Sequence, residues 1–170
     1  LMAHFRDLPF AFQQSFSNHS HLKVIAGLAN FDLNSVIRIA RASAQGGADS
    51  IDVACDPKLV RRAYEESRLP ICVSSVQPQL FPEAVEAGAS MVEIGNFDSF
   101  YPQGRFFNAD EVLSLTRETR SLLPNVFLSV TVPHILPLNQ QADLAVSLVQ
   151  EGVDVIQTEG GTSSRPNSSG

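Results

Sequence analysis

The sequence has few of the residues that mark several common protein classes. It contains two cysteines, Cys55 and Cys72, whose number and spacing form neither a disulfide framework nor a metal-binding motif, so a reducing compartment is expected. Lysine is equally scarce, and the net charge of −6 argues against binding to nucleic acid or to an anionic membrane surface. No apolar run approaches the roughly 18 residues of a membrane span. The 170 residues, 44% of them hydrophobic, are enough for the core of one domain.

A short pattern that begins with a glycine occurs three times. The three glycines are Gly47, Gly88 and Gly152. The fifth residue after each glycine is polar, and these residues are Asp52, Glu93 and Gln157. Mostly apolar neighbours alternate with them, and alternation with a period of two predicts a strand. Because a helix-like segment precedes each glycine, we interpret the glycine as a helix C-terminal cap that leads directly into the strand.

The shared phase of the three copies predicts where their side chains point. The apolar set should lie beneath covering helices, and it consists of Ile51, Val53, Val92, Ile94 and Ile156. The opposite set, which contains Asp52, Glu93 and Gln157, should then face the lumen if the sheet closes into a barrel. Carboxylates are rarely buried without a partner or a task, so we expect a functional site there. The alternative is a purely structural role, in which the hydrogen bonds of these polar residues are satisfied inside a packed barrel.

Six strands are predicted, alternating with helices. Their ranges are 22–28, 49–54, 70–76, 90–95, 125–132 and 153–159. This order predicts an α/β fold with a parallel sheet, a (β/α)8 TIM-barrel-like architecture truncated after six βα units. Residues 1–21 form an N-terminal helix or extension, residues 22–161 the partial barrel, and residues 162–170 a polar tail cut before the last two units. A complete barrel needs roughly 250 residues, so two units are either lost or supplied by a partner.

Helix starts are marked by capping residues at three places. Asp32 is predicted to cap the helix that follows the first strand. Asp56 caps the next helix, with Pro57 at its first position. Asn108 and Glu111 form a capping-box-like pair at the start of the helix after residue 107.

Four strings resemble one known family. They are L-K-V-I-A-G-L-A-N-F-D (22–32), V-E-I-G-N-F-D-S-F-Y (92–101), L-S-V-T-V-P-H (128–134) and I-Q-T-E-G-G-T-S-S (156–164). Over residues 22 to about 166 the chain resembles the hypothetical chloroplast reading frame twenty-three (Ycf) family. The resemblance implies a TIM-barrel-like protein of cyanobacteria or plastids, located in the stroma or in the cyanobacterial cytoplasm. It also implies a later glycine-rich, phosphate-binding stretch that this chain does not contain.

Candidate site residues are expected at the C-terminal ends of the strands, where barrel enzymes carry their active sites. The predicted catalytic residues are Glu93, Glu159, Asp52 and His134. The predicted substrate-binding residues are Asn30, Asn96, Arg105, Thr131, Gln157, Gly160, Gly161 and Thr162. Carboxylates that share one lumen should raise the pKa of at least one of them, which suits general acid–base catalysis. The proton-transfer group is expected to be Glu93 or Glu159, and Asp52 is expected to orient that group or the substrate.

Several residues have alternative interpretations. His134 is either catalytic or a loop histidine in solvent. Lys23 is either a Schiff-base lysine or, as we prefer because it lies early in its strand, a salt-bridge partner. The aromatic loop 96–107 is either a lid over an anionic ligand or a loop packed on the barrel rim or another subunit. No metal site is predicted, and the sequence specifies no cofactor.

Two classes of function follow. The first is a lyase or isomerase that performs acid–base chemistry on a small phosphorylated or carboxylated metabolite at the C-terminal barrel mouth. The alternative is a non-catalytic barrel that binds a metabolite or flavin and has a regulatory role. The inward carboxylates favour the enzyme, whereas the lack of a recognised nucleophile or metal motif favours the binder. The expected partner is a small anionic molecule, with no nucleic acid or membrane, and unpaired strand edges leave a homo-oligomer open.

Overall fold

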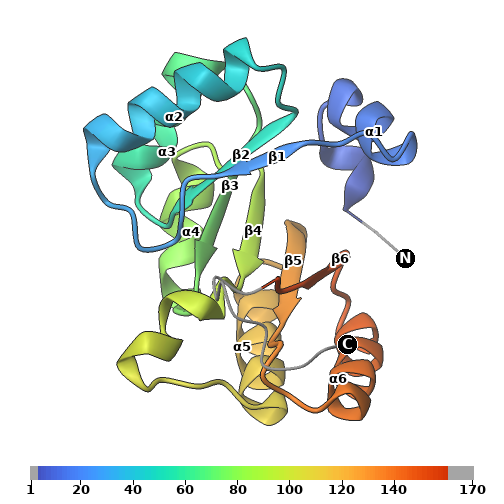
Figure 1. The fold of residues 1–170 in the computed structure, drawn as a ribbon. Coiled ribbons are helices and arrows are strands. Elements are labelled where there is room, and N and C mark those ends of the chain that lie inside the picture. Colours follow the sequence, from blue (N-terminus) through green and yellow to red (C-terminus); the bar gives the residue numbers. More distant parts are fainter. Residues whose placement is uncertain (1–3, 161–170) are drawn as a thin grey trace.

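A computed structural model describes residues 4–160 of the chain, which form a curved sheet covered by helices (Figure 1). The strands are β1 (Lys23–Ile25), β2 (Ser50–Ala54), β3 (Ile71–Ser75), β4 (Met91–Ile94), β5 (Phe127–Val132) and β6 (Val155–Thr158). They are all parallel and lie in sequential order from β1 to β6. The predicted parallel α/β fold is confirmed as six strands of a partial barrel.

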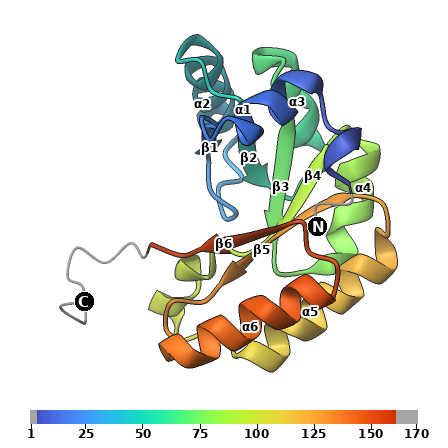
Figure 2. The ribbon, with the colours of Figure 1, turned by 90° about the vertical axis from the view of Figure 1, so that its right-hand side faces the viewer.

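Helices connect consecutive strands as the sequence predicts, and one further helix, α1, precedes β1. They are α1 (Phe10–Ser17), α2 (Leu33–Gln45), α3 (Pro57–Ser67), α4 (Phe81–Glu86), α5 (Ala109–Leu122) and α6 (Leu138–Gln150). Short 3₁₀ turns are η1 (Phe5–Asp7), η2 (Pro78–Leu80), η3 (Phe97–Ser99) and η4 (Tyr101–Gln103). Helices α2 to α6 follow the outer side of the sheet, and α1 lies near the strand starts (Figure 2). None of the helices within residues 4–160 is both long enough and apolar enough to cross a bilayer.

The predicted caps occur where the sequence places them. The side chains of Asp32 and Asp56 each accept two backbone N–H groups of the helix that follows. Asn108 accepts the N–H of Glu111 at 2.9 Å, but the Glu111 carboxylate pairs with Arg105 rather than completing a capping box. The glycines that begin the three repeated patterns adopt positive φ angles between 76° and 116°, as a helix C-terminal cap requires.

Two strands are shorter than predicted. β1 covers three residues instead of the predicted 22–28, because Gly27 adopts a φ of 102° and turns the chain away from the sheet. β6 begins at Val155 rather than at residue 153, because the Val153 N–H donates to the Leu148 carbonyl of α6 and closes the connection from that helix. Within the described residues, β1 and β6 are the two sheet edges, and Ile25 is 45% exposed.

The two faces of the sheet have different neighbours. Outward residues such as Ile51, Val92 and Leu128 are fully buried in one core beneath the helices. On the inward face, Phe12 of α1 packs against Met91 and Phe127 and fills the N-terminal end of the lumen. The N-terminal helix α1 therefore covers the inward face of the sheet near the starts of the strands.

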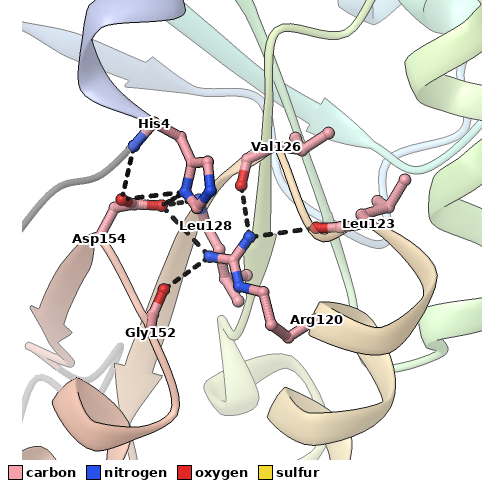
Figure 3. A network of polar contacts seen from close by, with 7 residues as sticks. All are labelled: His4, Arg120, Leu123, Val126, Leu128, Gly152 and Asp154. Atoms are coloured by element: carbon pink, nitrogen blue, oxygen red, sulfur yellow. Dashed lines mark hydrogen bonds and ion pairs between the residues drawn. The ribbon is translucent and has the colours of Figure 1, made fainter.

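A buried polar network fastens the start of β6 to its surroundings (Figure 3). The Asp154 carboxylate, whose side chain is 1% exposed, accepts hydrogen bonds from the Leu128 N–H at 3.0 Å and from Arg120 at 3.2 Å. His4 contacts the same carboxylate at 3.1 Å. Arg120 also donates to the backbone carbonyls of Leu123, Val126 and Gly152. Asp154 therefore ties α5, β5, β6 and the N-terminal segment together.

We expect Asp154→Asn to lower the free energy of unfolding by about 3 kcal/mol, because it leaves the half-buried Arg120 without its ionic partner. Urea denaturation measures this loss. The matched control is Asp143→Asn, since Asp143 is an exposed residue of α6. A loss in Asp154→Asn no larger than that of the control would show that the network does not stabilise the fold.

Candidate functional site

The three polar residues of the repeated pattern converge in the lumen. Gln157 donates to the Glu93 carboxylate at 3.3 Å, so β4 and β6 are joined through their inward side chains. Asp52 and Glu93 are both completely buried. The predicted inward phase of these residues is therefore what the structure shows.

Lys23 connects the members of this layer. Its ammonium donates hydrogen bonds to Glu93 and, at 3.1 Å, to Gln157, and it lies 3.8 Å from an Asp52 oxygen. Burial alone would lower the pKa of Lys23, but the neighbouring Cys72, Glu93 and Asp52 outweigh burial, and the pKa is raised overall. A Schiff-base lysine must lose its proton to attack a carbonyl. The structure therefore supports the salt-bridge interpretation of Lys23 over that of a Schiff-base lysine.

Asp52 holds a proton close to neutral pH. Burial raises its pKa to about 7, and the nearby Glu93 carboxylate adds to this rise. Lys23 and a 2.5 Å hydrogen bond from Ser74 act in the opposite direction and do not cancel it. The expectation that a shared lumen raises the pKa of one carboxylate is confirmed, and the carboxylate is Asp52.

Glu159 lies beyond this layer, at the C-terminal mouth formed by the ends of β4, β5 and β6. Its carboxylate accepts the Asp98 N–H at 3.0 Å, the Tyr101 hydroxyl at 2.8 Å and the His134 N–H at 3.1 Å. Its side chain is 5% exposed. Three segments distant in sequence thus meet on one buried carboxylate.

The fourth contact of Glu159 orients the imidazole of His134. His134 Nδ1 lies 2.8 Å from Glu159 and 3.4 Å from Asp98, and the side chain remains 38% exposed. A nitrogen that faces two carboxylates is best placed as a proton donor to them. Nε2, which has no partner within residues 4–160, is then the nitrogen that can exchange a proton with a ligand. This geometry favours the catalytic interpretation of His134 over that of a loop histidine in solvent.

The aromatic loop between β4 and α5 packs on the barrel rim. Phe97 and Phe107 are buried and lie against each other with a ring separation of 4.6 Å, and both belong to the main core. Tyr101 reaches the mouth, and burial together with the hydrogen bond to Glu159 raises its pKa above the usual value. In this structure the loop is therefore a packed wall of the mouth rather than an open lid.

The predicted ligand-binding residues divide into three groups. Asn96 Nδ2 and Thr131 Oγ1 are buried without a hydrogen-bond partner among the described residues, so both remain suited to a ligand. Asn30 instead bonds to Ala26 and Ser35 within its own loop, and Arg105 pairs with Glu111. Gly160 directly follows the mouth residue Glu159, whereas Gly161 and Thr162 lie outside the described residues.

A glycine keeps Thr131 at the mouth. Gly95, with a φ of 156°, ends β4, and a Cβ atom built on it would lie 2.0 Å from Thr131 Oγ1. Any larger residue would therefore displace the Thr131 hydroxyl. Asn96 follows with a φ of 59°, an uncommon conformation for a residue other than glycine. Asparagine is among the residues that tolerate this left-handed conformation, so the turn after β4 forms without glycine at this position.

Two donor sets have the composition of a metal site. Asp52, Cys72 and Glu93 form one, and Asp98, His134 and Glu159 form the other. In the first, the Lys23 ammonium already supplies the compensating positive charge. In the second, Glu159 already accepts four hydrogen bonds. The geometry of both sets is thus explained by contacts within the protein, and neither requires a cation.

Some of these contacts could not be found by motif. Ser74 has no distinguishing sequence pattern, although its inward parity on β3 follows from its alignment with Glu93. The sequence places Lys23 on the first strand, but its reach across the lumen depends on side-chain length and strand tilt. One sequence signal could have identified Lys23 and Ser74: each side chain points to the same face of the sheet as the buried carboxylates, and one supplies a cation and the other a hydroxyl group.

These features define the class of the protein: a partial (β/α) barrel with a charged lumen and a polar C-terminal mouth. It is similar in fold to a putative deoxyribose-phosphate aldolase from Coccidioides immitis, with a TM-score of 0.60 at 15% identity over 84% of this chain and 59% of that one. A solved structure described as "QR15, an Aldolase" gives a TM-score of 0.61 at 19% identity, covering 87% and 69% of the two chains. At these identities the similarity concerns the fold alone.

The chain itself belongs to the family described as "Protein of unknown function (DUF561)", whose model matches residues 9–170. It is 54% identical to "Uncharacterized protein ycf23" of Cyanophora paradoxa over 82% of this chain and 58% of the relative. It is 40% identical to the protein of the same name from Porphyra purpurea, over 88% and 56%. The family expected from the four strings is confirmed, and the chain spans a little over half the length of these relatives.

The raised pKa of Asp52 predicts a pH dependence of stability. The folded state favours the proton on Asp52 from the ordinary pKa of 3.8 up to about 7, so this stability is present at low pH and is lost as the pH rises through about 7. Asp52→Asn needs no proton there. Its free energy of unfolding should therefore increase relative to wild type between about pH 4 and 7, and then level off. Urea titrations across this range measure the difference, and parallel curves for the two proteins would refute the assignment.

Proposed function

We propose that this protein is a barrel enzyme of the lyase or isomerase type, which transfers a proton to or from a small phosphorylated or carboxylated metabolite at the C-terminal mouth. The observation that carries the proposal is the pair formed by the buried Glu159 carboxylate and the partly exposed His134 imidazole, 2.8 Å apart. A carboxylate that holds one imidazole nitrogen directs the other toward a substrate, which is a common arrangement for a general acid–base.

The remaining polar groups give this pair a substrate site. Thr131 and Asn96 offer unpartnered donors beside the mouth, which suit a carbonyl or carboxylate oxygen of the substrate. Below them, the Lys23 ammonium is held close to Glu93 and Asp52. Because Glu93 compensates the Lys23 charge, the groups left to stabilise negative charge that develops on a substrate are the Asn96 amide and the Thr131 hydroxyl.

The aldolase-type neighbours support the same reaction class by analogy of fold, although a shared fold does not by itself imply a shared reaction. We place the protein in plastids or in cyanobacterial cells, because its relatives named ycf23 come from algae such as Porphyra purpurea. The few lysines and the net charge of −6 favour a small-molecule substrate over nucleic acid.

Exchange of substrate protons with deuterated water tests this function directly. A protein with the relatives' full length is incubated with dihydroxyacetone phosphate or pyruvate in deuterated buffer, and loss of the proton signal next to the carbonyl is followed by NMR. We expect exchange above the buffer rate with at least one probe. His134→Asn should slow that exchange by about a hundredfold or more, because it removes the proton-transfer group.

The matched control is His19→Asn, since His19 is exposed and has a φ of 56°, a conformation that asparagine tolerates. This variant should exchange at the wild-type rate. Saturable binding of a probe, read by thermal shift, without any exchange above buffer would overturn the enzymatic assignment in favour of the regulatory binder. Equal exchange rates in His134→Asn and wild type would show that His134 is not the acid–base.

A further inference from the structure

A cavity lies at the N-terminal ends of the strands, at the opposite end of the barrel from the mouth. Its volume is about 700 Å³, and it is bounded by α1, by α3 and by the segments that lead into β2, β3 and β4. Ligand pockets commonly have volumes of roughly 300–1,000 Å³. This groove is too large for a lone phosphate ion, and the mouth residues His134 and Glu159 do not line it.

Two arginines border this N-terminal groove without a carboxylate partner. Arg61 and Arg68 lie on either side of Tyr64 on α3 and its C-terminal cap, and within residues 4–160 neither forms an ion pair. The acidic residues of the groove are already engaged. Asp49 accepts the Leu22 N–H at 2.8 Å, and Glu65 pairs with Arg62. The groove therefore presents two guanidinium groups that no carboxylate within residues 4–160 pairs with.

The conformation of Arg68 is a second, independent observation. It caps α3 with a φ of 59°, a position where glycine is strongly preferred because a side chain strains this backbone. Its guanidinium lies 5.5 Å from the centre of the Tyr64 ring, which is 47% exposed. A cation and an aromatic ring are thus held together at the groove edge, at a site where the fold alone would favour glycine.

The opposite wall of the groove is apolar. Pro9 and Phe12 come from the N-terminal segment, and Leu69 and Pro70 precede β3. An apolar wall, an exposed tyrosine ring and two guanidinium groups together match a ligand with a planar ring at one end and a multiply charged anion at the other. Arginine binds phosphate oxygens in a bidentate manner, and aromatic rings stack on nucleobases.

We propose that this N-terminal groove binds a nucleoside phosphate, with Arg61 and Arg68 on the phosphates and Tyr64 against the base. This site is separate from the acid–base mouth, so the proposal does not depend on the reaction carried out there. A ligand that bridges α1 and α3 would also stabilise the folded state, since it binds only when these two helices are in place.

Isothermal titration with ADP, adenosine and pyrophosphate tests the proposal on the full chain. ADP should bind more tightly than either fragment. Arg61→Ala and Arg68→Gly should each weaken ADP binding by about tenfold or more, because each removes a charge-assisted contact. Arg68→Gly is the sharper variant, since glycine suits the positive φ and the melting temperature should stay equal or rise.

Arg38→Ala is the matched control, because Arg38 is an exposed arginine of α2 outside the groove. It should bind ADP as wild type does, and so should His134→Asn. Absence of saturable ADP binding at millimolar concentration would overturn the proposal. So would wild-type affinity in Arg61→Ala and Arg68→Gly. Pyrophosphate binding as tight as that of ADP would refute the role of the base and of Tyr64.

Discussion

The ammonium of Lys23 is the constraint on which the interior of this barrel depends. Two carboxylates, Asp52 and Glu93, are completely buried on the inward face of the sheet, where an uncompensated charge is very costly. Lys23 contacts both, and Gln157 satisfies Glu93 from the far edge. The glycine caps set the strand phase that turns these acids inward, and the Lys23 ammonium lowers the cost of burying them there.

The mouth lies above this neutralised layer and is formed by residues at the ends of the strands. Glu159 follows β6, His134 follows β5, and Tyr101 lies in the packed loop after β4, so three connections meet where parallel strands end. The absence of a side chain at Gly95 leaves space for the Thr131 hydroxyl, and Phe97 anchors the loop after β4 in the core. The lower layer thus supplies a support whose buried charges compensate one another, and the upper layer supplies groups that can exchange protons.

Local sequence signals predicted the strands, the caps and the inward parity of Asp52, Glu93 and Gln157, because each depends on near neighbours in the chain. They predicted less where distant segments decide the outcome. The Asp154–Arg120–His4 network joins residues up to 150 positions apart, and no periodicity marks it. β1 is shorter than its apolar run because Gly27 turns the chain, and Arg105 is taken up by Glu111 rather than by the mouth.

A double-mutant cycle between Lys23 and Glu93 tests most directly whether the polar lumen is one coupled network. The free energies of unfolding are measured by urea for wild type, Lys23→Met, Glu93→Gln and the double variant. Lys23→Met leaves the Glu93 carboxylate buried without its cation, and Glu93→Gln leaves Lys23 with Asp52 alone as its acidic neighbour in this layer of the described residues. The double change removes both partners, so we predict a coupling energy of about 1–3 kcal/mol. Losses that add to within about 0.5 kcal/mol would contradict the account, because the two groups would then be independent.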